Sequence, residues 1–350
     1  MSIGQRIKQA RKANNFSLRK LADEIWVSAM AISKYERDLD VPGSGVLLRL
    51  SQALNVKLDF FFRPNMVSVQ LQAYRKHASL GVKEQESIQM RIQDWVERYC
   101  EVESLFPDEQ RSVNLPVHKV NSLDEVEDIA LALRDHWNLG YDPIENLVQL
   151  LEDQGIKVGI IAGFDHFDAC TFQVDGDPVI VTKGELSGDR QRFNLGHELG
   201  HLALAVQGDL KPEQAANRFA GAFLVPARTA HFELGTQRTD LNINELYMLK
   251  QKYGLSMQAW VYRARDLEII SENTATRLFQ QFRVNGWHKQ EPGQPYPPEL
   301  PTRMERLIYR ALAENLISRS RAQELLGKPL QLQWELETLQ HHDLAVHTGN

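Results

Sequence analysis

The sequence predicts a multidomain protein with an all-α head, an α+β middle domain and a helical C-terminal extension. Three observations predict this class. Apolar residues recur at helical spacing in short segments of residues 1–65, strand-like apolar runs flank a turn near residue 176, and helical patterns fill most of the chain after residue 188. With 350 residues and 43% hydrophobic content, the chain can form two or three domains with cores of their own.

Composition and charge narrow the class of protein further. Only two cysteines occur, Cys100 and Cys170, which excludes a disulfide scaffold or a cysteine-built zinc finger and fits a reducing cytosol. No apolar run approaches the roughly 18 residues of a membrane span, so we expect a cytoplasmic protein with no membrane contact. The net charge is −6, yet residues 1–65 carry +5 and the remaining chain −11. This asymmetry predicts a head that faces phosphates.

Residues 1–65 are expected to form a compact helical module. Ser17 and Ser28 stand where N-caps would begin its second and third helices. The stretch Pro42-Gly43-Ser44-Gly45 predicts a loop, and Pro64 closes the unit.

Residues 66–122 are expected to link this module to the next domain through a long amphipathic helix over residues 83–106. Its apolar positions alternate four and three residues apart, as in a coiled-coil seam; they are Ile88, Ile92, Trp95, Tyr99, Val102 and Phe106. Such a helix either packs on the core of its own chain or pairs with a second copy in a homodimer. Three heptads are marginal for a coiled coil, so we favour the first interpretation.

Residues 123–235 are expected to form the α+β domain. Two helices come first, then a strand, then a hairpin around Asp175-Gly176-Asp177, and finally two more helices. The expected ranges are 123–137 and 143–154 for the first helices, 156–161 for the strand, 169–174 and 178–182 for the hairpin, and 212–225 for the last helix.

Residues 236–350 are expected to be mostly helical. Residues 291–301 contain five prolines and predict a linker or an extended surface strap. Residues 304–326 predict two helices joined by a short turn, which form either a packing pair, the interpretation we favour, or a second helix-turn-helix. The last twenty residues are expected to form a loosely held tail. Its His341 and His342 have no carboxylate or cysteine at metal-ligand spacing, so they are not expected to bind metal.

The clearest chemical signal is the stretch His197-Glu198-Leu199-Gly200-His201. Histidines four residues apart on a helix project from one face, so both imidazoles can reach one zinc ion. Glu198 would act as general base toward a water molecule whose pKa the metal lowers, which is the chemistry of peptide hydrolysis. Gly196 and Gly200 would let a neighbouring backbone approach this helix closely.

Catalytic zinc needs a third protein ligand and an open fourth position. Glu213 lies twelve residues after His201, which is enough for a turn and a return helix. An exposed carboxylate favoured by the helix dipole is the other explanation for Glu213. Asp209, the preceding carboxylate, is expected in the loop.

Residues 190–201, together with Asn217-Arg218-Phe219-Ala220, resemble the ImmA/IrrE metallopeptidases, and the resemblance extends over roughly residues 125–230. It implies a minimal zincin domain that binds Zn²⁺ and cleaves a partner repressor. The sequence departs from the family at Ala215, where many members carry glutamate. Either Glu213 is the ligand in this branch, or the site and its activity are weakened.

Residues 17–37 resemble an Xre/Cro-type helix-turn-helix, in which residues 28–37 would be the recognition helix in the major groove. This resemblance implies a set of DNA-contacting residues: Arg19, Lys20, Ser28, Ala29, Met30, Ser33, Lys34 and Arg37. The family usually has glycine where Trp26 stands. The start of the recognition helix also offers few hydrogen-bonding groups, so a purely protein-contacting role is the alternative.

Taken together, these features predict a regulator that cleaves or engages a protein partner, a repressor or an antitoxin, through a zinc site and binds DNA through its head. One alternative is a non-cleaving transcription factor that uses the zincin fold as a sensor. Another is the toxin of a toxin–antitoxin pair.

Overall fold

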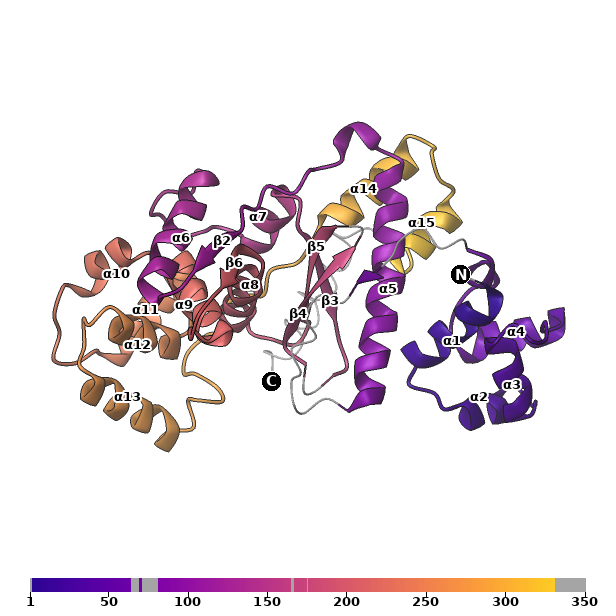
Figure 1. The fold of residues 1–350 in the computed structure, drawn as a ribbon, viewed down its shortest axis with the longest axis horizontal. Helices are drawn as coiled ribbons and strands as arrows, with labels where there is room; N and C mark the ends of the chain where they lie inside the picture. Colours follow the sequence, from indigo (N-terminus) through magenta and orange to yellow (C-terminus); the bar gives the residue numbers. More distant parts are fainter. Residues whose placement is uncertain (1, 64–68, 71–80, 165–166, 175, 331–350) are drawn as a thin grey trace, which may run out of the picture. The chain divides into compact units, whose positions relative to one another are not determined.

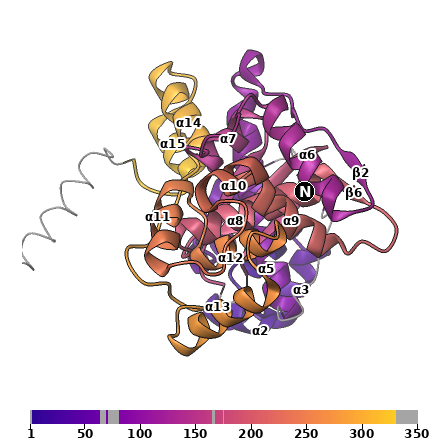
Figure 2. The same cartoon turned by 90° about the vertical axis from the view of Figure 1, so that its left-hand side faces the viewer.

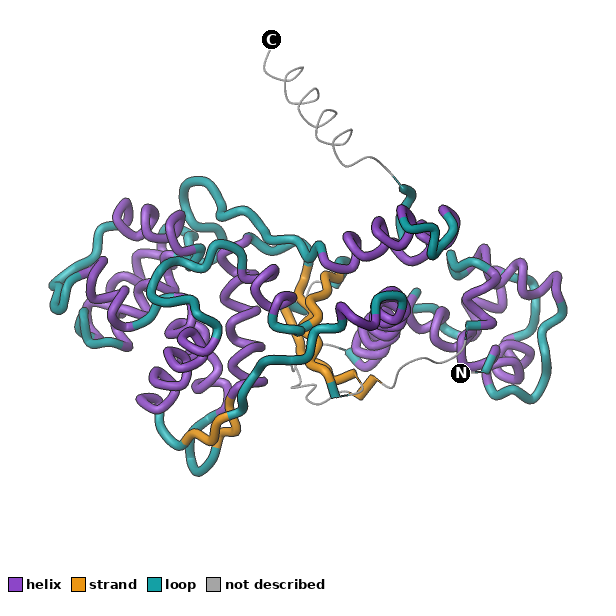
Figure 3. Tube along the Cα trace, turned by 90° about the horizontal axis from the view of Figure 1, so that it is seen from above, coloured by secondary structure: helices purple, strands orange, loops and turns teal. Residues whose placement is uncertain are grey.

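The computed structural model describes residues 2–63, 69–70, 81–164, 167–174 and 176–330 (Figure 1). The chain divides into two compact units. The first comprises Met1–Trp95 and Arg111–Pro301, and the second comprises Val96–Gln110 and the chain from Thr302 onward. Helices predominate over strands in the described residues, as Figure 3 shows. None of the described helices is long and apolar enough to cross a membrane.

The head is the all-helical module that the sequence predicts. Four helices and one 3₁₀ turn surround a core that includes Ile7, Leu21, Ile32 and Leu50. The elements are α1 (Ile3–Ala13), α2 (Leu18–Glu24), α3 (Ala29–Glu36), α4 (Ser44–Ala53) and the turn η1 (Leu58–Phe62).

Two serines begin the helices of the head as expected. The Ser17 hydroxyl accepts a hydrogen bond from the Lys20 amide, and the Ser28 hydroxyl accepts one from the Ala31 amide. Each serine therefore satisfies one of the free N–H groups at its helix start, and both predicted N-caps are confirmed.

The long helix of the linker, α5, spans Val82–Ser104. Most positions of its seam are buried within the chain, with Ile88, Ile92 and Val102 fully inaccessible to solvent. Trp95 is only half-buried, and its ring lies against Gly159, where a Cβ atom would come within 3.0 Å of the indole. The packing of α5 on its own chain is thus confirmed.

The main sheet has four strands in the order β1-β4-β5-β3. The hairpin strands β4 (Ala169–Val174) and β5 (Asp177–Lys183) pair antiparallel as predicted, while β3 (Lys157–Ile161) runs parallel to β5. Asp175, in the predicted turn, lies outside the described residues. A two-residue strand of the linker, β1 (Val69–Gln70), pairs antiparallel with the end of β4.

A second, two-stranded sheet was not predicted. It consists of β2 (His118–Val120) and β6 (Leu204–Val206), which pair in parallel. Strands of three residues are too short to show a hydrophobic period, so their sequence carries no signal.

The helices around these sheets occur in the expected order, but one of them, α7, begins later in the sequence than predicted. α6 spans Leu123–His136 and α7 spans Leu147–Asp153, so the prediction that the second helix begins at residue 143 is wrong. The side chain of Arg134 donates to the carbonyls of Gly140 and Asp142 at 2.8 and 2.6 Å. Those bonds hold the chain before α7 as a loop, and Asn146 then caps the helix.

One hydrophobic core joins the sheet domain to the helices that follow it. It runs in sequence from Val120 to Phe282 and includes Phe219, Phe223 and Trp260. The core therefore continues across residue 235, the predicted domain boundary. The remaining helices of this unit are α8 (Gly188–Ala203), α9 (Pro212–Leu224), α10 (Ala227–Leu234), α11 (Ile243–Tyr253), α12 (Met257–Asp266) and α13 (Glu272–Val284).

The proline-rich segment is a strap over the start of α8. The carboxylate of Glu299 is buried, pairs with Arg192 and accepts a hydrogen bond from the Val148 amide at 2.8 Å. Gln191 makes two hydrogen bonds of 2.8 Å with the Glu299 backbone. A Cβ atom at Gly188 would lie 1.9 Å from the Pro297 carbonyl oxygen, so only glycine fits under the strap.

The second unit packs two short helices, α14 (Arg303–Ala313) and α15 (Arg319–Leu326), on the end of α5. Their shared core is Val102, Phe106, Leu307, Ile308, Ala311, Ala322 and Leu325. An ion pair of 2.5 Å between Arg321 and Glu101 adds to this packing. The two helices thus pack on each other and on α5, as a packing pair would, and the choice between that and a second helix-turn-helix stays a prediction. His341 and His342 lie outside the described residues.

Candidate metal centre

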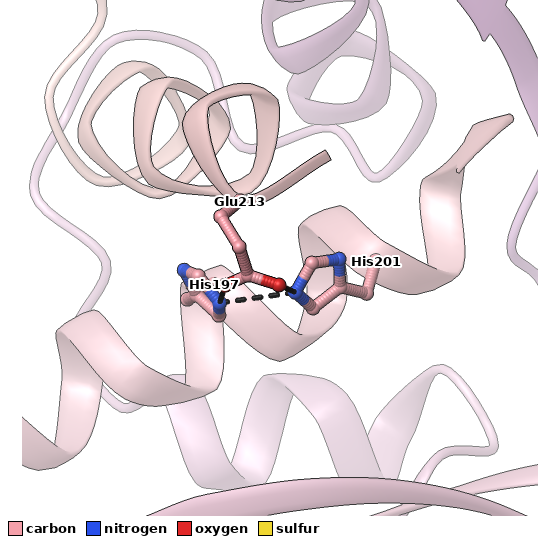
Figure 4. Close-up of side chains that lie close together, drawn as sticks. All are labelled: His197, His201 and Glu213. Carbon is pink, nitrogen blue, oxygen red and sulfur yellow. Dashed lines mark hydrogen bonds and ion pairs between the residues drawn. The ribbon is translucent and has the colours of Figure 1, made fainter. Parts of the chain in front are cut away.

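Three side chains from two helices converge in the first unit (Figure 4). His197 and His201 project from one face of α8, with their Nε2 atoms 3.0 Å apart. Glu213, in the first turn of α9, lies with one carboxylate oxygen 3.3 Å from Nε2 of His197 and the other 3.5 Å from Nε2 of His201. The HExxH spacing and the return helix thus bring together the three residues named from the sequence.

These distances fit the donor set of a zinc site. Ligand atoms at 2.0–2.1 Å from a tetrahedral zinc ion are separated from one another by about 3.3 Å. Here the two imidazole nitrogens lie 3.0 Å apart, and each lies 3.3 or 3.5 Å from a different oxygen of Glu213. With one ligand atom taken from each residue, all three lie within 4.8 Å of one another. Two imidazoles and one carboxylate also match the ligand types that catalytic zinc sites use.

Glycines on α8 allow α9 to lie close enough to deliver Glu213, and Figures 1 and 2 show the two helices side by side. A Cβ atom at Gly200 would lie 3.1 Å from the side chain of Phe219 and 3.2 Å from Cα of Ala216. At Gly196 the nearest atom, Cα of Ala220, would be 3.4 Å away. The predicted close approach is confirmed, and it is tighter at Gly200.

The position of Ala215 clarifies the departure from the family pattern. Ala215 is fully buried in the core, whereas the Glu213 side chain is 57% exposed and faces the histidines. Residues two apart lie on opposite faces of a helix, so a carboxylate at position 215 would point away from His197 and His201. Asp209 lies in the turn before α9, as expected.

Asn217 orients one of the histidines, a role the sequence did not reveal. Its Oδ1 lies 2.8 Å from Nδ1 of His197. An Nδ1–H that donates to Asn217 fixes the tautomer in which the other ring nitrogen, Nε2, is free to bind metal. The neighbouring Arg218 has a different function, because it pairs with Asp266 of α12 at 3.1 Å and so ties α9 to the helical core.

Glu198 lies beside the cluster and is half-buried. The hydroxyl of Thr171, on β4, donates a hydrogen bond to its carboxylate. Burial raises the pKa of the adjacent Cys170 thiol well above its ordinary value, and the negative charge of Glu198 adds to the shift. No local pattern indicated that β4 would supply a partner for Glu198, because the contact joins residues 27 positions apart.

Comparison with known proteins agrees with this geometry. Residues 152–265 match the IrrE N-terminal-like domain of peptidase family M78, and residues 7–61 match a helix-turn-helix domain. The chain joins a helix-turn-helix domain to an IrrE-like domain. The IrrE-like domain contains all three residues of the cluster, and its match ends at residue 265 within α12.

Curated relatives match short stretches of the chain. The HTH-type transcriptional regulator ImmR of Bacillus subtilis is 34% identical over 68 residues, which is 19% of this chain and 54% of that protein. The uncharacterized HTH-type transcriptional regulator y4wC of Sinorhizobium fredii is 36% identical over 64 residues, 18% of this chain and 45% of that protein. The chain thus spans about half the length of the curated relatives it matches.

A solved structure aligns over most of the chain. The X-ray structure of the SHP pheromone receptor Rgg2 of Streptococcus dysgalactiae is 14% identical and covers 93% of this chain and 99% of its own, with a TM-score of 0.16.

In the helix-turn-helix domain, the residues named as DNA contacts lie on α2, on α3 and at their ends. Arg19, Lys20, Lys34 and Arg37 are exposed, and so is Met30. Of the other three, Ser28 is exposed and uses its hydroxyl as the N-cap of α3, and Ala29 and Ser33 are half-buried. Their role in DNA contact stays a prediction.

Trp26 occupies the turn between α2 and α3 with φ of +56°, a backbone conformation that favours glycine. Its side chain is 84% exposed. The turn therefore keeps the geometry of the motif despite the bulky residue.

Proposed function

We propose that the protein is a zinc-dependent peptidase that hydrolyses a peptide bond in a protein partner and regulates transcription. The observation that carries this proposal is the meeting of His197, His201 and Glu213 at zinc-like separations in an IrrE-like domain. These three side chains would hold the metal. Zinc bound there would polarise the scissile carbonyl and lower the pKa of an attacking water molecule.

The chain's own residues would prepare this chemistry. Glu198 would accept the proton of the attacking water and deliver it to the leaving amine. The Thr171 hydroxyl would hold the Glu198 carboxylate in one orientation, and Asn217 would do the same for the imidazole of His197. The Glu213 side chain is 57% exposed, so the cluster is open to solvent at this residue.

DNA binding by the head is the second part of the proposal. The helix-turn-helix match and the local net charge of +5 support it. α3 would enter the major groove, with Lys34 and Arg37 at its C-terminal end and Arg19 and Lys20 on α2 toward the backbone phosphates. The smaller residues Ser28, Ala29, Met30 and Ser33 would face the bases.

The partner would be a repressor or an antitoxin, and a non-cleaving sensor is the competing function. Fusion to a helix-turn-helix domain favours the sensor. A transcription factor could change its DNA binding when a metal or ligand binds the IrrE-like domain, without hydrolysing a peptide bond. The two functions differ at Glu198. Replacement by glutamine should reduce peptidase activity by about 10²- to 10⁴-fold. A sensor that only binds metal would keep its regulatory response.

Zinc stoichiometry tests the metal site directly. Elemental analysis of the purified chain should give one zinc per chain in the wild type. Glu213→Ala and His201→Ala should lose it, and Asp209→Ala, which removes a nearby carboxylate outside the cluster, should keep it. Absence of zinc from the supplemented wild type would overturn the proposal.

The peptidase activity is tested in vitro. The substrates are helix-turn-helix proteins encoded by genes that neighbour the gene of this protein. The zinc-loaded wild type should cut one of them, and Glu198→Gln should reduce the rate by about 10²- to 10⁴-fold while keeping zinc and fold. Unchanged cleavage by Glu198→Gln would remove the general-base role.

A further inference from the structure

The third helix of the head, α3, has a narrow exposed face. Within α3, all of which the structure describes, only Met30 and Lys34 are exposed. Ile32, midway between them in the sequence, is fully buried in the core of the head. Two positions correspond to about 200° around a helix, so Met30 and Lys34 both lie on the side opposite Ile32. They are four positions apart and are therefore neighbours on one face.

Two polar side chains of this region are engaged away from that face. Glu36 is the only carboxylate of α3, and Arg11 donates to its two oxygens at 2.5 and 2.9 Å. The Glu36 side chain is only 7% exposed, so it places no negative charge on the outer face. The Ser28 hydroxyl is the N-cap and accepts its hydrogen bond from the Ala31 amide. The outer face of α3 thus combines one apolar side chain with one cation.

Met30 is the apolar member of this pair. It is the second residue of α3, and its side chain is 63% exposed. In a helix-turn-helix domain, the N-terminal residues of the recognition helix lie against the base edges. A thioether has no hydrogen-bond donor and is only a weak acceptor. Met30 would therefore meet the bases without forming a strong hydrogen bond to any of them.

Thymine is the base that suits such a side chain. In the major groove it carries a C5-methyl group, whereas adenine, guanine and cytosine present hydrogen-bonding groups there. A thioether laid over those polar groups would displace their water without replacing the hydrogen bonds. Contact with the thymine methyl group instead removes apolar surface of both partners from water.

We propose that Met30 selects thymine in a DNA site by contact with its C5-methyl group, and that Lys34 bonds a guanine close to that thymine. This inference rests on the proposed DNA binding by the head and names the bases that its recognition helix selects. Lysine donates to the O6 and N7 acceptors of guanine. Four residues along α3 span about 6 Å, close to two base-pair steps of about 3.4 Å. The guanine would therefore lie within about two base pairs of the thymine.

Removal of the methyl group from the DNA tests the proposal. The full wild-type chain selects sequences from a library of random duplexes, and the enriched pool is amplified once with dTTP and once with dUTP. The two probes contain the same sequences and differ only in their C5-methyl groups. Gel-shift titration at one salt concentration compares them, because the phosphate contacts that dominate affinity are then common to both probes.

The expected difference between the probes is small but measurable. Loss of one buried methyl group should weaken wild-type binding to the dUTP probe about three- to fivefold. Met30→Ala shortens the side chain that makes the contact, so its affinities for the two probes should agree within about 1.5-fold. Leu39→Ala is the matched control, because Leu39 is 66% exposed and follows the end of α3. It should keep the difference seen with the wild type.

A second variant tests the same position by a change of base. Glutamine forms two hydrogen bonds with the N6 and N7 groups of adenine. A new selection with Met30→Gln should therefore enrich adenine where the wild type enriches thymine, and it should leave the neighbouring guanine in place.

The outcomes separate the proposal from DNA binding itself. A wild-type chain that enriches no sequence would refute DNA binding by the head, and the base assignment with it. Equal wild-type affinity for the two probes, or an undiminished difference in Met30→Ala, would refute only the reading of thymine. Enrichment of the same base by Met30→Gln and by the wild type would also overturn it.

Discussion

The close packing of α9 against α8 predicts that two glycines of α8, Gly196 and Gly200, respond differently to replacement by alanine. Replacing either glycine by alanine gains about 0.5–1 kcal/mol of helix propensity, and this gain is common to both variants. At Gly196 the added methyl would meet its nearest neighbour at 3.4 Å, an ordinary contact. At Gly200 it would meet the Phe219 side chain at 3.1 Å and Cα of Ala216 at 3.2 Å, so these residues of α9 must give by a few tenths of an ångström.

Overpacking of a well-packed core costs about 1–3 kcal/mol. Gly200→Ala should therefore be less stable than Gly196→Ala by about that amount, since the propensity gain cancels between them. For a domain of this size the difference corresponds to about 2–4 °C in melting temperature per kcal/mol. Gly200→Ala should also bind zinc more weakly, because Glu213 is carried by the same helix, α9.

Thermal denaturation of the metal-free full chain, followed by circular dichroism, measures the stability difference. Zinc titration with a competing chelator measures the affinity of each variant. Equal melting temperatures and equal zinc affinities for the two variants would refute the account of the α8–α9 contact.

Further predictions concern residues that support the site and the head. Arg192→Met should destabilise the first unit by about 3–5 kcal/mol in denaturant titration, because it leaves the buried Glu299 carboxylate without its cation. Asn217→Ala should weaken zinc binding about 10- to 100-fold in chelator competition, because His197 loses its orienting bond. Ser28→Ala should lower the stability of the head by about 1 kcal/mol and weaken DNA binding in a gel-shift assay. Because burial raises the pKa of Cys170, its thiolate fraction at pH 8 is small, and mass spectrometry should find alkylation by iodoacetamide much slower in the folded than in the unfolded chain.

The predictions for Arg192, Asn217 and Ser28 each have a control variant or a result that would contradict them. The double variant Arg192→Met, Glu299→Leu should recover most of the lost stability, and no recovery would contradict the ion-pair explanation. Zinc affinity of Asn217→Ala equal to wild type would mean that His197 needs no orienting partner. Ser28→Thr should keep the cap, and a melting temperature as low as that of Ser28→Ala would assign the loss to another cause.

Some parts of the fold are readable in the sequence because the signal is local. Ser17 and Ser28 directly precede the helices that they cap, and the hairpin of β4 and β5 follows from two strand-like apolar runs around a short turn. The start of α7 was mispredicted because the residues before it bond to the buried Arg134 side chain rather than to a helix. That competition depends on where Arg134 lies in three dimensions.

The sequence by itself determined that two imidazoles would lie together at the metal centre. Because His197 and His201 are four positions apart on one helix, their side chains lie on the same face of that helix, whatever surrounds it. Only the tertiary structure decided that Glu213 rather than position 215 faces them, that Thr171 and Asn217 support the site, and that β1 joins the sheet beside it. Each of these contacts joins different elements, and their meeting depends on how closely the helices and strands pack rather than on any local pattern.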